Sequence, residues 1–64
     1  MIVRSAIIYF PNGDTATFRE LVGNVNKIEV ILGMGGTRVE IFTNNYQHKE
    51  VFVGIPFSYE MYTE

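Results

Sequence analysis

The sequence lacks several residues on which small domains often depend. It has 64 residues, with no cysteine, one histidine and two prolines. Without cysteine the chain forms no disulfide framework, and a lone histidine excludes the usual structural zinc sites. A chain of this length buries only about 60% of the surface that its unfolded form exposes. Its stability must therefore come from a dense core or from a second chain.

Charge is also sparse, since charged residues make up 19% of the chain and the formal net charge is −2. Sequence-independent nucleic-acid binding needs clustered basic side chains, whereas the basic residues here occur singly along the chain. The sequence contains no apolar run of about 18 residues, the length needed to span a membrane, and the N-terminus lacks the pattern of a secretory signal. We expect no nucleic-acid partner, no membrane association and a cytoplasmic location.

Apolar residues, by contrast, are abundant for so small an interior: 47% of the chain is hydrophobic and 14% is aromatic. We interpret the excess as surface that contacts another protein or a second copy of the chain. Exposed apolar patches of this kind mark protein contacts.

The chain is organised around residues 26–43, where apolar and polar residues alternate on both sides of the tetrapeptide GMGG. Alternation with period two is typical of half-buried strands, and two such runs around a glycine-rich loop predict a β-hairpin. Met34 lies at its tip between two glycines. It is either a spacer in the turn or an exposed side chain that adapts to a partner surface.

The register of this hairpin follows from its apolar positions. If Gly33 to Gly36 form the loop, one face is apolar over the pairs Leu32–Thr37, Val30–Val39 and Ile28–Ile41. This register places Glu29 opposite Glu40, an unfavourable like-charge pair. A tighter loop would instead place Glu40 opposite Ile31, with the same face toward the core.

Residues 1–10 are rich in β-branched and aromatic types and predict one strand. The segment Pro11–Asp14 suits a type I turn followed by a bulge. This turn pairs Ile8 with Ala16 and Ala6 with Phe18 on the core face.

Residues 19–26 break the alternation and predict an irregular connection that tucks Leu21 and Val25 under the sheet. A turn at Asn44–Asn45 follows the hairpin, and residues 46–53 predict the next strand. The tail from residue 55 to 64 is rich in large apolar and aromatic residues, unlike an unanchored terminus. We predict an edge strand, or a strand donated to a second protomer.

These segments predict a single all-β domain over residues 1–64. We expect a small antiparallel meander of five to six strands, forming a curved sheet or a small barrel and dimerised.

Motifs for chemistry are weak. His48 has polar neighbours on all sides and no sequence link to a nucleophile, which favours a surface histidine over a catalyst. The acidic residues fall mostly at outward strand positions or in turns, and GMGG lacks the lysine and the following helix of a phosphate-binding loop. We expect a protein that is not an enzyme and that uses no cofactor or metal.

Tyrosine and methionine are over-represented at interface cores, and they recur in this chain beside other aromatics. The residues that we predict to contact a partner or a second copy are Tyr9, Phe42, Phe57, Tyr59, Met61 and Tyr62, with Met34 as an exposed loop contact.

A short acidic all-β chain with the turn Pro11–Asp14, a GMGG hairpin and an aromatic tail from Phe57 resembles the small proteins that bacteriophages encode to disable a host factor, including anti-defence and anti-CRISPR proteins. The resemblance implies a homodimer that blocks a bacterial defence protein by covering its surface, in the host cytoplasm. Two alternatives stay open. The aromatics could stack single-stranded nucleic acid on a small barrel, and the interface surplus could belong to a structural protein of a virion.

Overall fold

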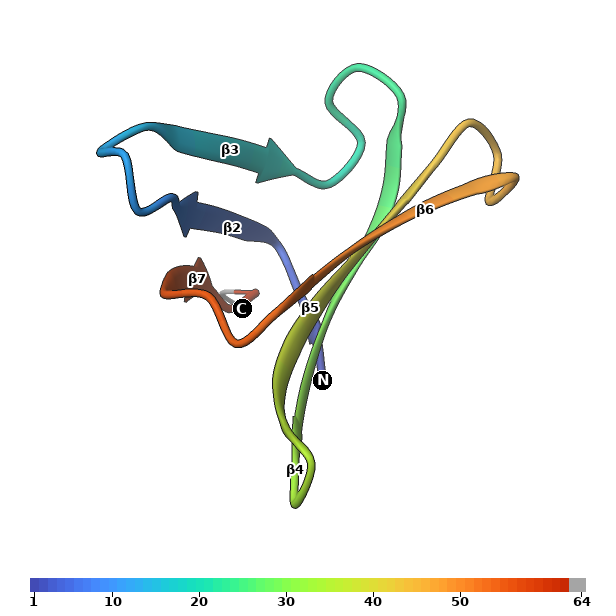
Figure 1. Ribbon diagram of the computed structural model, residues 1–64. Helices are drawn as coiled ribbons and strands as arrows, with labels where there is room; N and C mark the ends of the chain where they lie inside the picture. The colour runs from blue at the N-terminus through green and yellow to red at the C-terminus, as the bar shows by residue number, and fades with distance from the viewer. Residues whose placement is uncertain (63–64) are drawn as a thin grey trace.

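The computed structural model describes residues 1–62, which form seven strands and no helix. This part of the chain therefore contains no helix that could span a membrane. The strands are β1 (Ile2–Val3), β2 (Ser5–Tyr9), β3 (Thr15–Arg19), β4 (Val25–Gly33), β5 (Gly36–Thr43), β6 (His48–Val53) and β7 (Phe57–Glu60). They build two antiparallel sheets, in the orders β1-β4-β5-β6 and β3-β2-β7 (Figure 1). The all-β antiparallel prediction is confirmed. The prediction of five to six strands in one curved sheet or barrel is wrong.

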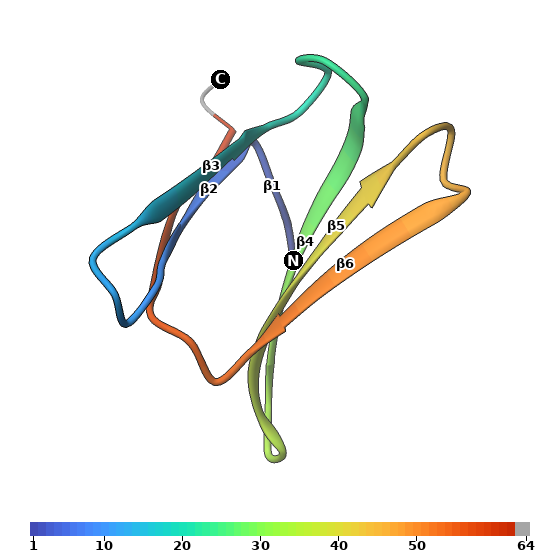
Figure 2. The same cartoon turned by 45° about the horizontal axis from the view of Figure 1, so that its top comes forward.

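The first error lies at Arg4, where the predicted first strand divides. β1 pairs with β4 of the larger sheet, whereas β2 pairs with β3 and β7 of the smaller one. Figure 2 shows the chain passing from one sheet to the other at this point. The backbone of Arg4 stays bonded, because its N–H donates to the Glu60 carbonyl and its carbonyl accepts from the Glu20 N–H. No glycine, proline or asparagine marks the crossing, so the sequence gives no turn signal.

The second crossing follows β6. Gly54 has a positive φ of 66°, and the chain then passes through Pro56 to β7, which pairs with β2 rather than with β6. The strand is therefore an edge of the smaller sheet and pairs within its own chain. Residues 63 and 64 of the predicted C-terminal strand lie outside the described residues.

The predicted hairpins are confirmed residue by residue. In β4–β5, Val30 pairs with Val39 and Glu29 with Glu40, so the register with the tighter loop is wrong. In β2–β3, Ile8 pairs with Ala16. Gly13 closes that turn with φ 92°, a conformation that favours glycine.

Two smaller predictions fail in the connections. Leu21 was predicted to lie under the sheet but is 76% exposed. It sits in a turn with φ 61°, and its N–H donates to the Val25 carbonyl. Val25 is buried, as predicted. The strand predicted from residue 46 begins at His48. The predicted turn at Asn44–Asn45 is confirmed, and it extends through Tyr46, since all three residues have positive φ.

The core lies between the sheets and consists of buried aliphatic side chains: Val3, Ala6, Ile8, Val25, Ile28, Val30, Val39 and Ile41. Phe52 closes one side of it, with its ring centroid 6.1 Å from that of Phe10 and 5.8 Å from that of Phe18. The accessible surface is 4397 Å², close to the ~4,200 Å² expected of a compact monomer of this mass. The total surface therefore carries no large excess, and the location of the exposed apolar side chains matters more than their number.

Candidate functional site

The residues predicted as one interface are spread over three parts of the molecule. Phe42 lies on the outer face of the larger sheet, and Tyr9 on the outer face of the smaller sheet, where its hydroxyl hydrogen-bonds that of Ser58 at 2.9 Å. Phe57 faces inward and contacts the core, and its ring lies 6.0 Å from that of Tyr59. These side chains do not form a single surface.

The last predicted residues, Met61 and Tyr62, follow β7 and are each about half exposed. The Tyr62 hydroxyl donates a hydrogen bond to the Glu20 carboxylate, which holds the tail beside the loop between β3 and β4. That loop exposes Leu21 and Val22. The tail is therefore held on its own chain, next to a small apolar area that the sequence did not predict.

A second group of exposed apolar side chains lies at the end of the β4–β5 hairpin and includes Met34, the most exposed of them in the described chain. We call residues 32–37 the hairpin tip. Leu32 is 64% exposed and Met34 fully exposed, and Figures 1 and 2 show the tip extending away from the smaller sheet. The Gly54 N–H donates to the Thr37 carbonyl at 3.2 Å, so Val53, also 64% exposed, lies beside the tip.

Strand lengths explain why the tip is bare. β4 has nine residues and β5 eight, whereas the strands of the smaller sheet have four or five. At ~3.3 Å per residue, β4 spans roughly 30 Å, and Figure 1 shows the strands of the smaller sheet crossing it well short of the hairpin end. Leu32 lies on the core-facing side of β4 but beyond the reach of the smaller sheet, which leaves it in solvent. Its alternation alone could not reveal this.

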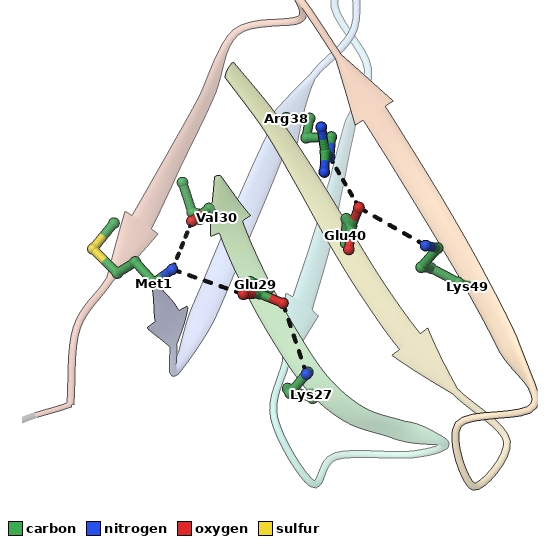
Figure 3. Close-up of polar contacts among 7 residues, drawn as sticks. All are labelled: Met1, Lys27, Glu29, Val30, Arg38, Glu40 and Lys49. Atoms are coloured by element: carbon green, nitrogen blue, oxygen red, sulfur yellow. Dashed lines mark hydrogen bonds and ion pairs between the residues drawn. The ribbon is translucent and has the colours of Figure 1, made fainter. Parts of the chain in front are cut away.

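The outer face of the larger sheet carries a polar network (Figure 3). The Glu40 carboxylate is largely buried and accepts from the Arg38 guanidinium at 2.9 Å, with the Lys49 ammonium at 3.9 Å. Glu29 lies 3.7 Å from the Lys27 ammonium and 4.0 Å from the N-terminal amine of Met1. These pairs offset the like-charge contact of the two glutamates that the register imposes.

Phe42 sits within this network, with the Lys27 ammonium 4.4 Å from its ring centroid and that of Lys49 at 5.8 Å. Three of the chain's five basic side chains thus share one face with an aromatic ring. Glu29 and Glu40 compensate two of their charges, which leaves a side-chain excess of one. Such an excess does not make a groove for a phosphate backbone, where each neutralised phosphate adds to affinity.

Residues 1–62 hold no pocket and no group of three potential metal ligands. His48 begins β6 on an exposed strand, opposite Thr43. The described chain thus offers surfaces rather than a cleft.

Tyr62 provides a test of the tail's position. Its hydrogen bond to Glu20 raises its pKa above the ordinary value of 10.0, with further contributions from burial and from the charge of Glu20. Because the folded pKa is raised, the contact stabilises the fold below the unfolded pKa and is lost as the pH rises through the folded value. We expect Glu20→Gln to lower the pKa of Tyr62 toward 10.0, measured from its ring NMR signals. Glu29→Gln, in the other sheet, should leave it unchanged, and equal titration in all three chains would place the tail elsewhere.

Comparison with known proteins finds no matching family model, no matching curated protein and no matching solved structure. The function is therefore argued from the geometry of the chain itself.

Proposed function

We propose that the chain is a non-enzymatic protein-binding module that contacts its partner with the hairpin tip. The observation that carries the proposal is the exposure of Leu32 and Met34 at one end of the molecule. Following the resemblance to bacteriophage proteins, we propose that the partner is a bacterial defence protein in the host cytoplasm. The chain acts as a homodimer and inhibits that protein by covering its surface.

The magnitudes favour the tip as an anchor. Fully burying a leucine or methionine side chain contributes ~1.5–3 kcal/mol, so Leu32 and Met34 together offer ~3–6 kcal/mol before the costs of association. Methionine is unbranched and polarizable, and it adapts to irregular surfaces. The Met34 side chain is fully exposed between two glycines, so no neighbour restricts the rotamer that it adopts against a partner. The tip suits a shallow apolar pocket on a partner.

A photo-crosslinking residue at position 34 tests the contact. We expect p-benzoylphenylalanine at Met34 to form one dominant crosslinked product in a bacterial lysate. The same residue at Asn12, in the exposed turn at another end of the chain, should not form it. Unlabelled chain added in excess should compete with the crosslinking chain and reduce the product. Unlabelled chain that carries Met34→Ser should not compete, although its circular dichroism spectrum should be unchanged. Equal crosslinking from positions 34 and 12 would refute the tip as the contact.

The inhibitory role needs a separate measurement. We expect bacteria that carry an active defence system and express this chain to lose protection against phage infection, by at least about tenfold in plating efficiency. The Met34→Ser chain, expressed at the same level, should leave protection intact. If the crosslinked partner is found but protection is unchanged, the chain binds a protein without inhibiting defence.

A further inference from the structure

β6 is an open edge of the larger sheet. It pairs with β5 on one side, and no described strand lies on its other side (Figure 2). The Gly54 N–H donates to the Thr37 carbonyl, and successive residues of an antiparallel pair alternate in the direction of their backbone bonds. Residues 48, 50 and 52 therefore bond to β5. The unpaired N–H and C=O groups along the open side belong to Lys49, Val51 and Val53.

The side chains at this edge favour a further strand. Val51 is 43% exposed and Val53 64% exposed, both on the outer face of the sheet. Natural edge strands avoid pairing through prolines, bulges, shortness or inward-pointing charges. β6 contains no proline, its six residues pair with β5 without a register shift, and its one inward-facing charge is Glu50. Its apolar C-terminal half is unprotected.

The other open edges are less suited to pairing. β1 has two residues, and the four residues of β7 follow directly on Pro56. β3 presents only polar side chains on its outer face, namely Thr15, Thr17 and Arg19. β6 is the longest open edge of the described chain, and Val53 is the most exposed apolar side chain on any of its edge strands.

We propose that β6 pairs antiparallel with β6 of a second copy, around a two-fold axis at Val51. The inference rests on the homodimer of the proposed function and assigns its surface. It joins two four-stranded sheets into one of eight strands, with both outer faces on the same side. Main-chain pairing of this kind is β-strand addition, and its two-fold symmetry makes the contact self-complementary.

The register follows from the residues that can face each other. An axis at Val51 pairs Val51 with its copy and Val53 with Lys49, and all three positions present unpaired backbone groups. An axis one residue earlier would set Glu50 against Glu50, a like-charge pair that disfavours it. An axis one residue later would leave Lys49 beyond the paired segment. The register at Val51 uses every free group of β6 and opposes no like charges.

The inner face leaves room for this arrangement. His48 and Glu50 point to the side of the smaller sheet, yet both are exposed, so no strand of their own chain covers them. In the proposed register Glu50 lies opposite the second copy's Phe52, which is only partly buried within its own chain. The hairpin tip takes no part in the pairing.

Cysteine crosslinking tests the register, because the chain contains no other thiol. At Val51 the two Cα atoms would lie about 5.5 Å apart, within the range of a disulfide, whereas the two copies of Val53 would be offset by about 13 Å along the strands. We expect Val51→Cys to form a disulfide-linked dimer at least about ten times faster than Val53→Cys in the same redox buffer. Equal rates would overturn the proposal.

N-methylation of Val51 in a synthetic chain provides an independent second variant. The methyl group blocks the open edge without removing a bond to β5, so the fold should persist by circular dichroism while light scattering reports a monomer. N-methylation of Thr17, whose N–H faces the open side of β3, should leave the dimer intact. A dimer that survives N-methylation of Val51 would overturn the assignment and leave the homodimer standing. A full chain that is monomeric at every concentration would overturn both, and crosslinking at position 34 would still report on the partner contact.

Discussion

Replacing Ile41 by alanine is expected to cause a large loss of stability. Ile41 is fully buried and faces Ile28 across the β4–β5 pair, at the centre of the layer between the sheets. Truncation of a buried isoleucine to alanine costs ~2–5 kcal/mol, because it removes apolar burial and leaves a cavity. Proteins are stable by ~0.05–0.15 kcal/mol per residue, or ~3–10 kcal/mol for this length. The substitution therefore removes at least about a fifth of the available stability, and all of it if the protein lies at the low end of that range.

Urea denaturation followed by circular dichroism, at a dilute and fixed concentration, measures the loss. The matched control is Leu32→Ala. Leu32 lies on the same face of the hairpin as Ile41, but it is exposed in the hairpin tip. We expect it to change the free energy of unfolding by less than ~1 kcal/mol. Similar losses for Ile41→Ala and Leu32→Ala would mean that the layer between the two sheets is not the core.

The contrast between Ile41 and Leu32 also shows how far the sequence could predict the fold. Period-two alternation assigns a residue to a face, and it placed both side chains on the core face of the hairpin. It cannot say where the opposite layer ends, because that depends on where β2, β3 and β7 cross the larger sheet. The turn residues fixed the two hairpins for a physical reason: Gly13 and Gly36 adopt positive φ, which glycine accepts without strain.

The crossings between sheets were not predictable in the same way. At Arg4 the chain changes sheets within an apolar run, and its backbone bonds go to Glu60 and Glu20, which are distant in sequence. The surface networks share this difficulty. The register predicted that Glu29 and Glu40 face each other, but Lys49 comes within reach of Glu40 only through the β5–β6 pairing. Because the basic residues occur one at a time along the chain, the sequence did not show that three of them lie on one face of the larger sheet.

Ending the chain after Pro56 is the second change for which we expect a large effect. It removes β7, the partner of β2 in the smaller sheet, and with it the Phe57 side chain that contacts the core. Ala6 and Ile8 on β2, now fully buried, would lose their neighbour on that side. Partial burial of an aromatic side chain alone contributes up to ~1.5–3 kcal/mol, and the lost backbone pairs add to this. We expect the truncated chain to be largely unfolded or aggregated by circular dichroism and light scattering.

A chain that ends after Glu60 is the control, because it keeps all of β7 and loses Met61, Tyr62 and the exposed bond to Glu20. It should fold like the full chain. Adding a synthetic peptide of residues 57–64 to the shorter chain should restore part of its structure, but only near the millimolar effective concentration that a short tether provides. If the full chain is a dimer and the chain ending at Pro56 stays folded as a monomer, β7 pairs between chains. If β7 pairs with β2 of its own chain, removing it must impair folding and not only assembly.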